Sequence, residues 1–120
     1  MTLNERLDLL AELGLYLCQT PDADLQTAVR QSFAENPWFT EANQQQALQA
    51  IAHALLDREK LAAWAAQYPI GSHQHPQKTV GLIMAGNIPL VGFHDWLCVF
   101  VAGERAKVKL SEKDRHLLPH

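Results

Sequence analysis

The chain has 120 residues, of which 48% are hydrophobic and 19% charged, with six glycines, six prolines and two cysteines, and this composition excludes a disordered chain and a disulfide scaffold. Its net charge of −3 is uneven, because residues 1–76 hold four Lys/Arg against nine Asp/Glu and residues 77–120 hold six against four. That balance argues against a nucleic-acid-binding module, and no apolar run reaches the roughly 18 residues of a membrane span.

The first half of the chain has the periodicity of helices. Leucines recur at three- and four-residue steps after Thr2 and Glu5, which have the spacing of a capping box. Glu5 and Asp8 precede any apolar block, so the N-terminus does not resemble a secretory signal, and we expect a cytoplasmic protein. Four helix starts are predicted, at Thr2, Thr20-Pro21, Thr40 and Asp57.

The pattern changes after a polar joint at residues 71–77. Residues 79–84, TVGLIM, form a short unbroken apolar run of the kind that is buried on both faces of a parallel sheet. A turn at 85–89 and a helix at 90–102 follow, with Gly103 suited to a left-handed C-terminal cap. Residues 105–110 alternate like a strand, and Ser111 is expected to cap a further helix with Glu112 and Asp114 in its first turn.

Strand, helix, strand and helix start are the opening of a βαβ unit. A parallel pair needs neighbouring strands and helices on both faces, yet the sequence ends at His120. We therefore expect an α/β fold fragment, with a helical N-terminal segment at residues 1–76 and the truncated start of an NAD(P)-binding α/β domain at residues 77–120. Its Rossmann-like sheet would be incomplete.

The turn at residues 85–90, AGNIPL, is the candidate site of chemistry. It leaves the carboxyl end of the first expected strand, where ligands bind in open α/β folds. Gly86 permits a close backbone approach and Asn87 carries an amide donor and acceptor. The same residues are common in plain turns, so spacing alone leaves both interpretations open.

The longer stretch carries a resemblance. Residues 79–114 resemble the aldehyde dehydrogenase superfamily, in which a strand precedes an N-x-P turn and a second strand ends in V-x-K-x-S. More closely, AGNIPLVGFHDWLCVFVAGERAKVKLSEKD is similar to the acyl-CoA reductases of the LuxC type, the fatty acid reductases. The helical block FTEANQQQALQAIAHALLDREKLAAWAAQYP is more loosely similar to the N-terminal region of that group.

The resemblance implies an oxidoreductase that reduces an acyl thioester, such as acyl-CoA, to an aldehyde with NADPH or NADH. It implies that Asn87 donates its amide to the oxyanion, and that Lys109, Ser111 and Glu112 contact the adenosine ribose of the cofactor. A homo-oligomer is implied for the full-length protein. An acid such as Glu112 suits the free ribose of NADH better than a 2′-phosphate. Lys113 and Arg115 lie close enough in sequence to offset a phosphate charge, so both cofactors remain open.

The acyl-accepting cysteine of that chemistry is expected beyond His120. Cys18 is expected on the leucine-rich face of the first helix and Cys98 inside an apolar helix, both as small core residues. His94 and Asp95 follow the turn closely, and either orient it or line the site entrance, or form an ordinary polar pair.

No metal site is expected. His73 and His75 lie in the polar joint without an acid or cysteine close by in the sequence to complete a ligand set. A polar linker is the preferred interpretation of that segment.

Two functions are compatible with these patterns. The first is the N-terminal part of an acyl-CoA reductase, inactive as an isolated 120-residue piece. The second is a small helical interaction module, or a paralogue without catalysis, whose strand pair is completed by another chain.

Overall fold

The computed structural model describes residues 1–19, 22–70 and 76–120. Four helices come first in the chain, and the side chain of each N-cap residue accepts a hydrogen bond from a first-turn amide. The helices are α1 (Leu3–Cys18), α2 (Ala23–Glu35), α3 (Glu41–Leu55) and α4 (Arg58–Ala65). The caps predicted at Thr2, Thr40 and Asp57 are confirmed, and the Thr2–Glu5 capping box is complete. The start predicted at Thr20-Pro21 lies outside the described residues, and Asp22 caps α2.

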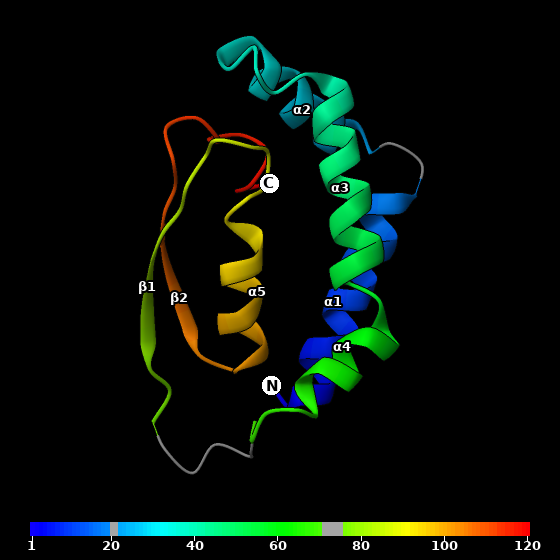
Figure 1. Ribbon diagram of the computed structural model, residues 1–120, viewed down its shortest axis with the longest axis vertical. Helices are drawn as coiled ribbons and strands as arrows, with labels where there is room; N and C mark the ends of the chain where they lie inside the picture. Colours follow the sequence, from blue (N-terminus) through cyan, green and yellow to red (C-terminus); the bar gives the residue numbers. More distant parts are fainter. Residues whose placement is uncertain (20–21, 71–75) are drawn as a thin grey trace.

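A parallel strand pair follows, as predicted. Strand β1 (Thr79–Ile83) and strand β2 (Arg105–Lys109) are joined by helix α5 (Phe93–Val101), and their register pairs Thr79 with Arg105 and Ile83 with Lys109. Gly103 has φ 78°, which confirms the left-handed turn expected after the helix. Both strands run toward the same end of the molecule, so the loops that follow them meet there (Figure 1).

Two predicted boundaries in this part are wrong. Helix α5 begins at Phe93 and not at Leu90, because Leu90 has φ 62° and cannot continue into a right-handed helix. The helix predicted from Ser111 does not form, and the described residues 111–120 make only turns. The Ser111 hydroxyl accepts from the Lys113 amide two residues on, which closes a local turn in place of a helix start.

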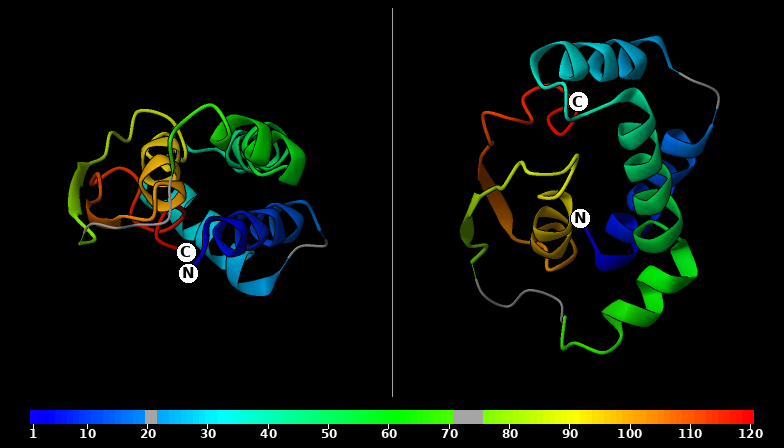
Figure 2. Two further views of the ribbon diagram at one scale, coloured as in Figure 1. Left: turned by 90° about the horizontal axis from the view of Figure 1, so that it is seen from below. Right: turned by 45° about the horizontal axis from the view of Figure 1, so that its top comes forward.

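Helix α5 lies between the strand pair and the layer of N-terminal helices (Figures 1 and 2). Its buried Leu97 and Val101 join one apolar cluster with leucines of α1, α3 and α4 and with Leu117 near the C-terminus. Buried Arg6 of α1 donates from Nε and Nη2 to the carbonyl oxygen of Val101, at 3.2 and 3.0 Å. Residues 1–76 and 77–120 therefore share a core and a buried hydrogen-bonded link.

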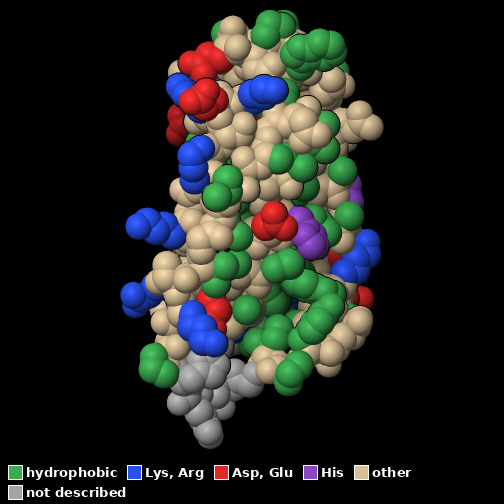
Figure 3. All heavy atoms as spheres, turned by 60° about the vertical axis from the view of Figure 1, so that its left-hand side comes forward, with side chains coloured by type: hydrophobic (Ala, Val, Ile, Leu, Met, Phe, Trp, Pro, Cys, Tyr) green, Lys and Arg blue, Asp and Glu red, His purple; other side chains and the backbone are tan. Residues whose placement is uncertain are grey.

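The opposite face of the strand pair is bare within the described chain, which corrects the expectation of burial on both faces. Only α5 covers the sheet, so alternate residues of β1 are exposed and Ile83 is 83% exposed. Arg105, Lys107 and Lys109 of β2 are exposed, and Figure 3 shows Lys and Arg side chains spaced along one edge of this view.

The described residues thus form a compact mixed domain of five helices and a two-stranded parallel sheet. None of these helices has both the length and the apolar character that crossing a membrane requires.

Candidate functional site

The two loops that follow β1 and β2 are packed against each other. A Cβ built on Gly86 would lie 2.2 Å from the Ser111 hydroxyl oxygen and 3.2 Å from the Cβ of Lys113. Glycine is therefore required at position 86 for steric reasons, since any side chain would separate the loops. This contact brings Gly86 and Ser111, two residues predicted from the sequence to belong to one site, to the same place at the carboxyl edge of the sheet.

A buried carboxylate fixes the geometry of both loops. The Asp114 side chain is 1% exposed and accepts from the Leu90 amide at 3.0 Å through Oδ2 and from the Leu118 amide at 3.2 Å through Oδ1. Leu90 is the residue with φ 62°, a conformation that costs a non-glycine residue about 1–2 kcal/mol. Asp114 thus holds the strained residue that ends the 85–90 turn, three residues after Asn87.

Asn87 lies on the exposed side of this turn, next to the half-exposed Ile88. Among the described residues no hydrogen bond engages the Asn87 side chain, so its amide is free to donate to a ligand. A free amide on a turn held by a buried hydrogen bond is suited to stabilising negative charge on a nearby oxygen.

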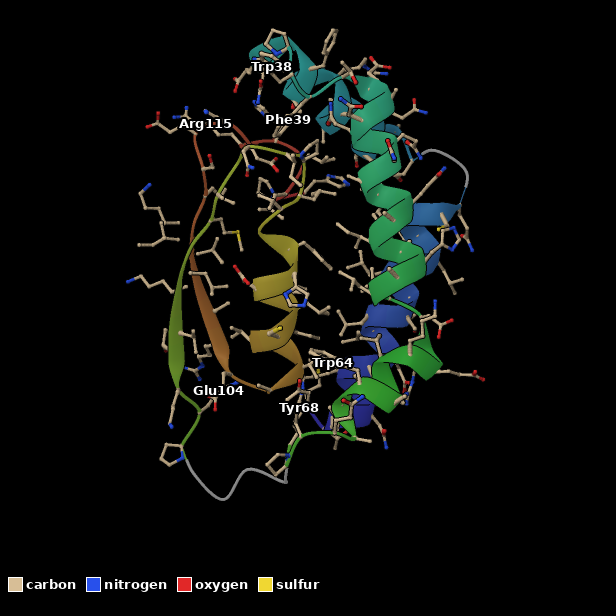
Figure 4. The ribbon with its side chains drawn as sticks, viewed as in Figure 1. Trp38, Phe39, Trp64, Tyr68, Glu104 and Arg115 are labelled. Atoms are coloured by element: carbon tan, nitrogen blue, oxygen red, sulfur yellow. The ribbon has the colours of Figure 1, made fainter. Side chains whose placement is uncertain are left out.

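The residues expected to contact a cofactor follow β2 along the same edge. Lys109 ends the strand with an exposed side chain that has no ion-pair partner among the described residues. The Glu112 carboxylate is 86% exposed and lies 3.8 Å from Nη2 of Arg115, an ion pair that water screens strongly. Figure 4 places Arg115 at this end of the sheet and Glu104 at the other end. The edge therefore presents an unpaired cation at Lys109 and, three residues later in the chain, an accessible carboxylate at Glu112.

Helix α2 supports this edge from the helical layer. The Asn36 amide donates to the Lys113 carbonyl oxygen at 3.2 Å, and Nε2 of His116 lies 3.0 Å from Oε1 of Glu35. The end of α2 thus contacts the segment that follows β2.

His94 and Asp95 occupy a different position. Both are exposed on α5, 3.9 Å apart between Nδ1 and Oδ1, and His94 Nδ1 also lies 3.9 Å from the sulfur of Cys98. The structure brings these three residues together, and no described contact links them to the Asn87 turn. This arrangement fits the helix-side polar pair left open by the sequence.

Cys98 is half-buried, and burial, with a smaller contribution from the Asp95 charge, raises the pKa of its thiol. A raised pKa lowers the thiolate fraction at neutral pH, which is the opposite of what a cysteine nucleophile needs. The raised pKa of the Cys98 thiol is therefore a physical argument against Cys98 as the acyl-accepting residue.

Cys98 is expected to react with iodoacetamide several times more slowly than an exposed thiol at pH 8, because less of it is ionised and part of it is covered. Its rate should still be rising at a pH where an ordinary thiol has levelled off. Alkylation rates of Cys18→Ser, which retains Cys98, and of Cys98→Ser, which retains Cys18, measure the difference. Equal rates in the two variants would contradict this assignment.

Cys18 departs from expectation, because it is exposed and not a core residue. Leu17 is buried, and the next helical position is turned by about 100° away from the core. The Cys18 sulfur lies 3.8 Å from Nε2 of His53 on α3, a pairing between helices that no sequence spacing indicated.

Among the described residues, no group of three or more His, Cys, Asp and Glu side chains could hold a metal ion. The polar-linker interpretation of His73 and His75 falls on residues outside the described ranges.

Comparison with known proteins adds no assignment: no family model, curated protein or solved structure matches this chain.

The sequence patterns missed the role of Asp114, which was expected to sit in a helix as a first-turn acid. Its true partner, the Leu90 amide, lies 24 positions earlier, so no local pattern connects them. A single clue was available: residues 111–120 are too few to show helical periodicity, so the pattern gave weak support to a helix there.

Proposed function

We propose that this chain forms the oxyanion-donor and cofactor-contacting part of an NAD(P)H-dependent acyl-CoA reductase. One observation carries the proposal: the Asn87 turn and the Lys109–Glu112 segment leave the same edge of a parallel strand pair and are packed together through Gly86 and Ser111. In open α/β folds this edge binds ligands. The resemblance of residues 79–114 to the LuxC-type reductases supplies the reaction class.

The residues at the edge fit a dinucleotide cofactor. The free Lys109 ammonium can donate to a ribose hydroxyl, and the accessible Glu112 carboxylate can accept from one. Arg115 beside Glu112 reduces the local negative charge, so NADPH and NADH both remain compatible. When bound, the cofactor supplies the hydride that reduces the acyl group.

The proposed chemistry balances as acyl-CoA, NAD(P)H and a proton giving aldehyde, CoA and NAD(P)⁺. A cysteine thiolate attacks the thioester carbonyl and expels CoA, and the C–S bond to the cysteine breaks when the aldehyde leaves. In both steps negative charge develops on the carbonyl oxygen, where the Asn87 amide donates. The half-buried Cys98 is poorly suited to the attack, and no described contact links the exposed Cys18 to the Asn87 turn, so we propose that neither of them is the attacking cysteine.

Cofactor binding tests the proposal on the chain itself. We expect NADPH or NADH to shift the backbone amide resonances of residues 109–112 and the side-chain amide of Asn87 in a saturable NMR titration. Lys109→Ala should weaken binding about tenfold, since a hydrogen bond from a charged donor contributes about 1.5 kcal/mol.

Lys107→Ala is the matched control, because Lys107 is an exposed lysine on the same strand and face, two residues before the edge. Equal loss of affinity in both variants, or no shift at residues 109–112 with either nucleotide, would count against the proposed function.

The exposed outer face of the strand pair favours a second candidate, an interaction module completed by another chain. Ile83 is 83% exposed on this face, an apolar side chain at the end of β1 on an uncovered sheet. A partner that protects the outward-facing Ile83 and Val108 amides from hydrogen exchange, without any nucleotide binding, would favour this candidate.

A further inference from the structure

An apolar cavity of about 480 Å³ lies between the layer of N-terminal helices and α5, and reaches the ends of both strands. Ligand pockets in proteins have volumes of about 300–1,000 Å³ and mostly apolar walls. The walls come from four parts of the fold: Leu13 and Ile51 from the helical layer, Phe93 and Trp96 from α5, Val108 from β2, and Leu117 from the C-terminal turns.

Among the described residues, no Asp, Glu, Lys or Arg side chain lines the cavity. Its polar side chains are those of Tyr16 and His120, which form a 3.0 Å hydrogen bond between the phenol oxygen and Nε2. Both are exposed, so this pair forms a polar rim to an apolar interior. The occupant must therefore be apolar along its buried length and polar at one end.

The charge around the rim determines which polar end group the occupant can carry. Burial and the nearby carboxylate of Asp22, the N-cap of α2, raise the pKa of the Tyr16 phenol, so a carboxylate already lies beside the rim. A second anion placed there would be repelled, and no lysine or arginine lines the cavity to pair with it. A neutral hydroxyl could hydrogen bond with Tyr16 or His120 without this repulsion.

The volume sets the length of the occupant. An apolar cavity of about 150 Å³ stays dry and binds benzene, which has six carbons, so a threefold larger space corresponds to at most about 18 carbons. We propose that this cavity binds one neutral single-chain lipid, an alkyl chain of about 12 to 18 carbons with an uncharged polar end at the Tyr16–His120 rim. The inference is independent of the proposed reductase activity.

Trp96 lines the cavity and reports on its occupant. The other two tryptophans do not line it: Trp38 is 86% exposed, and Trp64 belongs to α4 (Figure 4). In a Trp38→Phe/Trp64→Phe protein, 12-bromo-1-dodecanol should quench Trp96 fluorescence saturably, because the bromine lies at the buried end. Unbrominated 1-dodecanol should compete for one site per chain, and dodecanoate should bind at least tenfold more weakly.

Leu13→Phe, in the same background, narrows the cavity and should weaken dodecanol binding at least tenfold. Leu15→Phe is the matched control, because Leu15 is on the same helix, is 60% exposed and does not line the cavity. Ile51→Phe narrows the cavity from α3 and replaces Leu13→Phe if thermal unfolding shows that variant to be misfolded. The proposal is overturned if 12-bromo-1-dodecanol does not quench Trp96 saturably, and also if dimerisation closes the cavity and prevents the quenching. Unchanged dodecanol affinity in the variant with the narrowed cavity would overturn it as well. Equal affinity for dodecanoate would overturn the neutral end group.

Discussion

Under the proposed function, replacing Asn87 with alanine is expected to lower the kcat for acyl-CoA reduction by a factor of about 10²–10³. The side-chain amide is exposed on a turn whose backbone is fixed by Asp114, and it is free of described hydrogen bonds. In the proposed function this amide donates to an oxygen that gains charge in the transition state, so kcat should fall while KM for acyl-CoA changes little. Steady-state oxidation of NADPH or NADH with saturating acyl-CoA measures the loss.

Ile88→Ala serves as the control for this loss. Ile88 is the next residue of the turn, is 55% exposed and carries no hydrogen-bond donor in its side chain. We expect its kcat to stay within a factor of about two to three of the parent value, since an exposed apolar side chain contributes little to the turn. A kcat for Asn87→Ala equal to that of Ile88→Ala would remove Asn87 from the chemistry.

Replacing Asp114 with alanine is expected to lower the free energy of unfolding by about 3–6 kcal/mol. The variant leaves the Leu90 and Leu118 amides without their shared acceptor, and hydrogen bonds to a charged group contribute about 1.5–3 kcal/mol each. The strained Leu90 backbone also loses the contact that holds it. Denaturant unfolding of the chain, followed by circular dichroism, measures the change.

Glu112→Ala removes an acid two residues away and should change the stability by less than about 0.5 kcal/mol, because its ion pair is exposed. Hydrogen exchange adds a local readout, since the Leu90 amide should lose protection in the Asp114 variant alone. Similar destabilisation by both substitutions would mean that Asp114 does not anchor the turn.

The N-terminal helices could be predicted because their signals are local. Thr2, Thr40 and Asp57 each accept from an amide within the first turn, so a few adjacent residues contain the whole interaction. The strands and Gly103 were likewise readable, the strands from their apolar or alternating pattern and the glycine from its position after a helix.

The errors arose where distant residues determine the structure. Residues 111–120 contain a good N-cap residue and an acid in the expected first turn. The Asp114 carboxylate nevertheless accepts from the Leu90 amide, and this tertiary contact outweighs the local helix signal. The delayed start of α5 has the same cause, since Leu90 is held at positive φ.

The candidate site was predictable in part. Its location at the strand ends follows from chain order in a βαβ unit, and Gly86 and Ser111 do meet there. Neither the exposed Cys18–His53 pair nor the apolar cavity was predictable, because their members come from helices and turns that are far apart in the sequence.

The most direct test of the central claim is an assay of the natural polypeptide that carries these residues, purified from its source cells at whatever length it has. Acyl-CoA and NADPH or NADH are supplied, and nucleotide oxidation and aldehyde are both measured. We expect one aldehyde and one free CoA thiol for each nucleotide oxidised. A polypeptide that binds either nucleotide but oxidises none, with acyl-CoA of any chain length, would contradict the central claim.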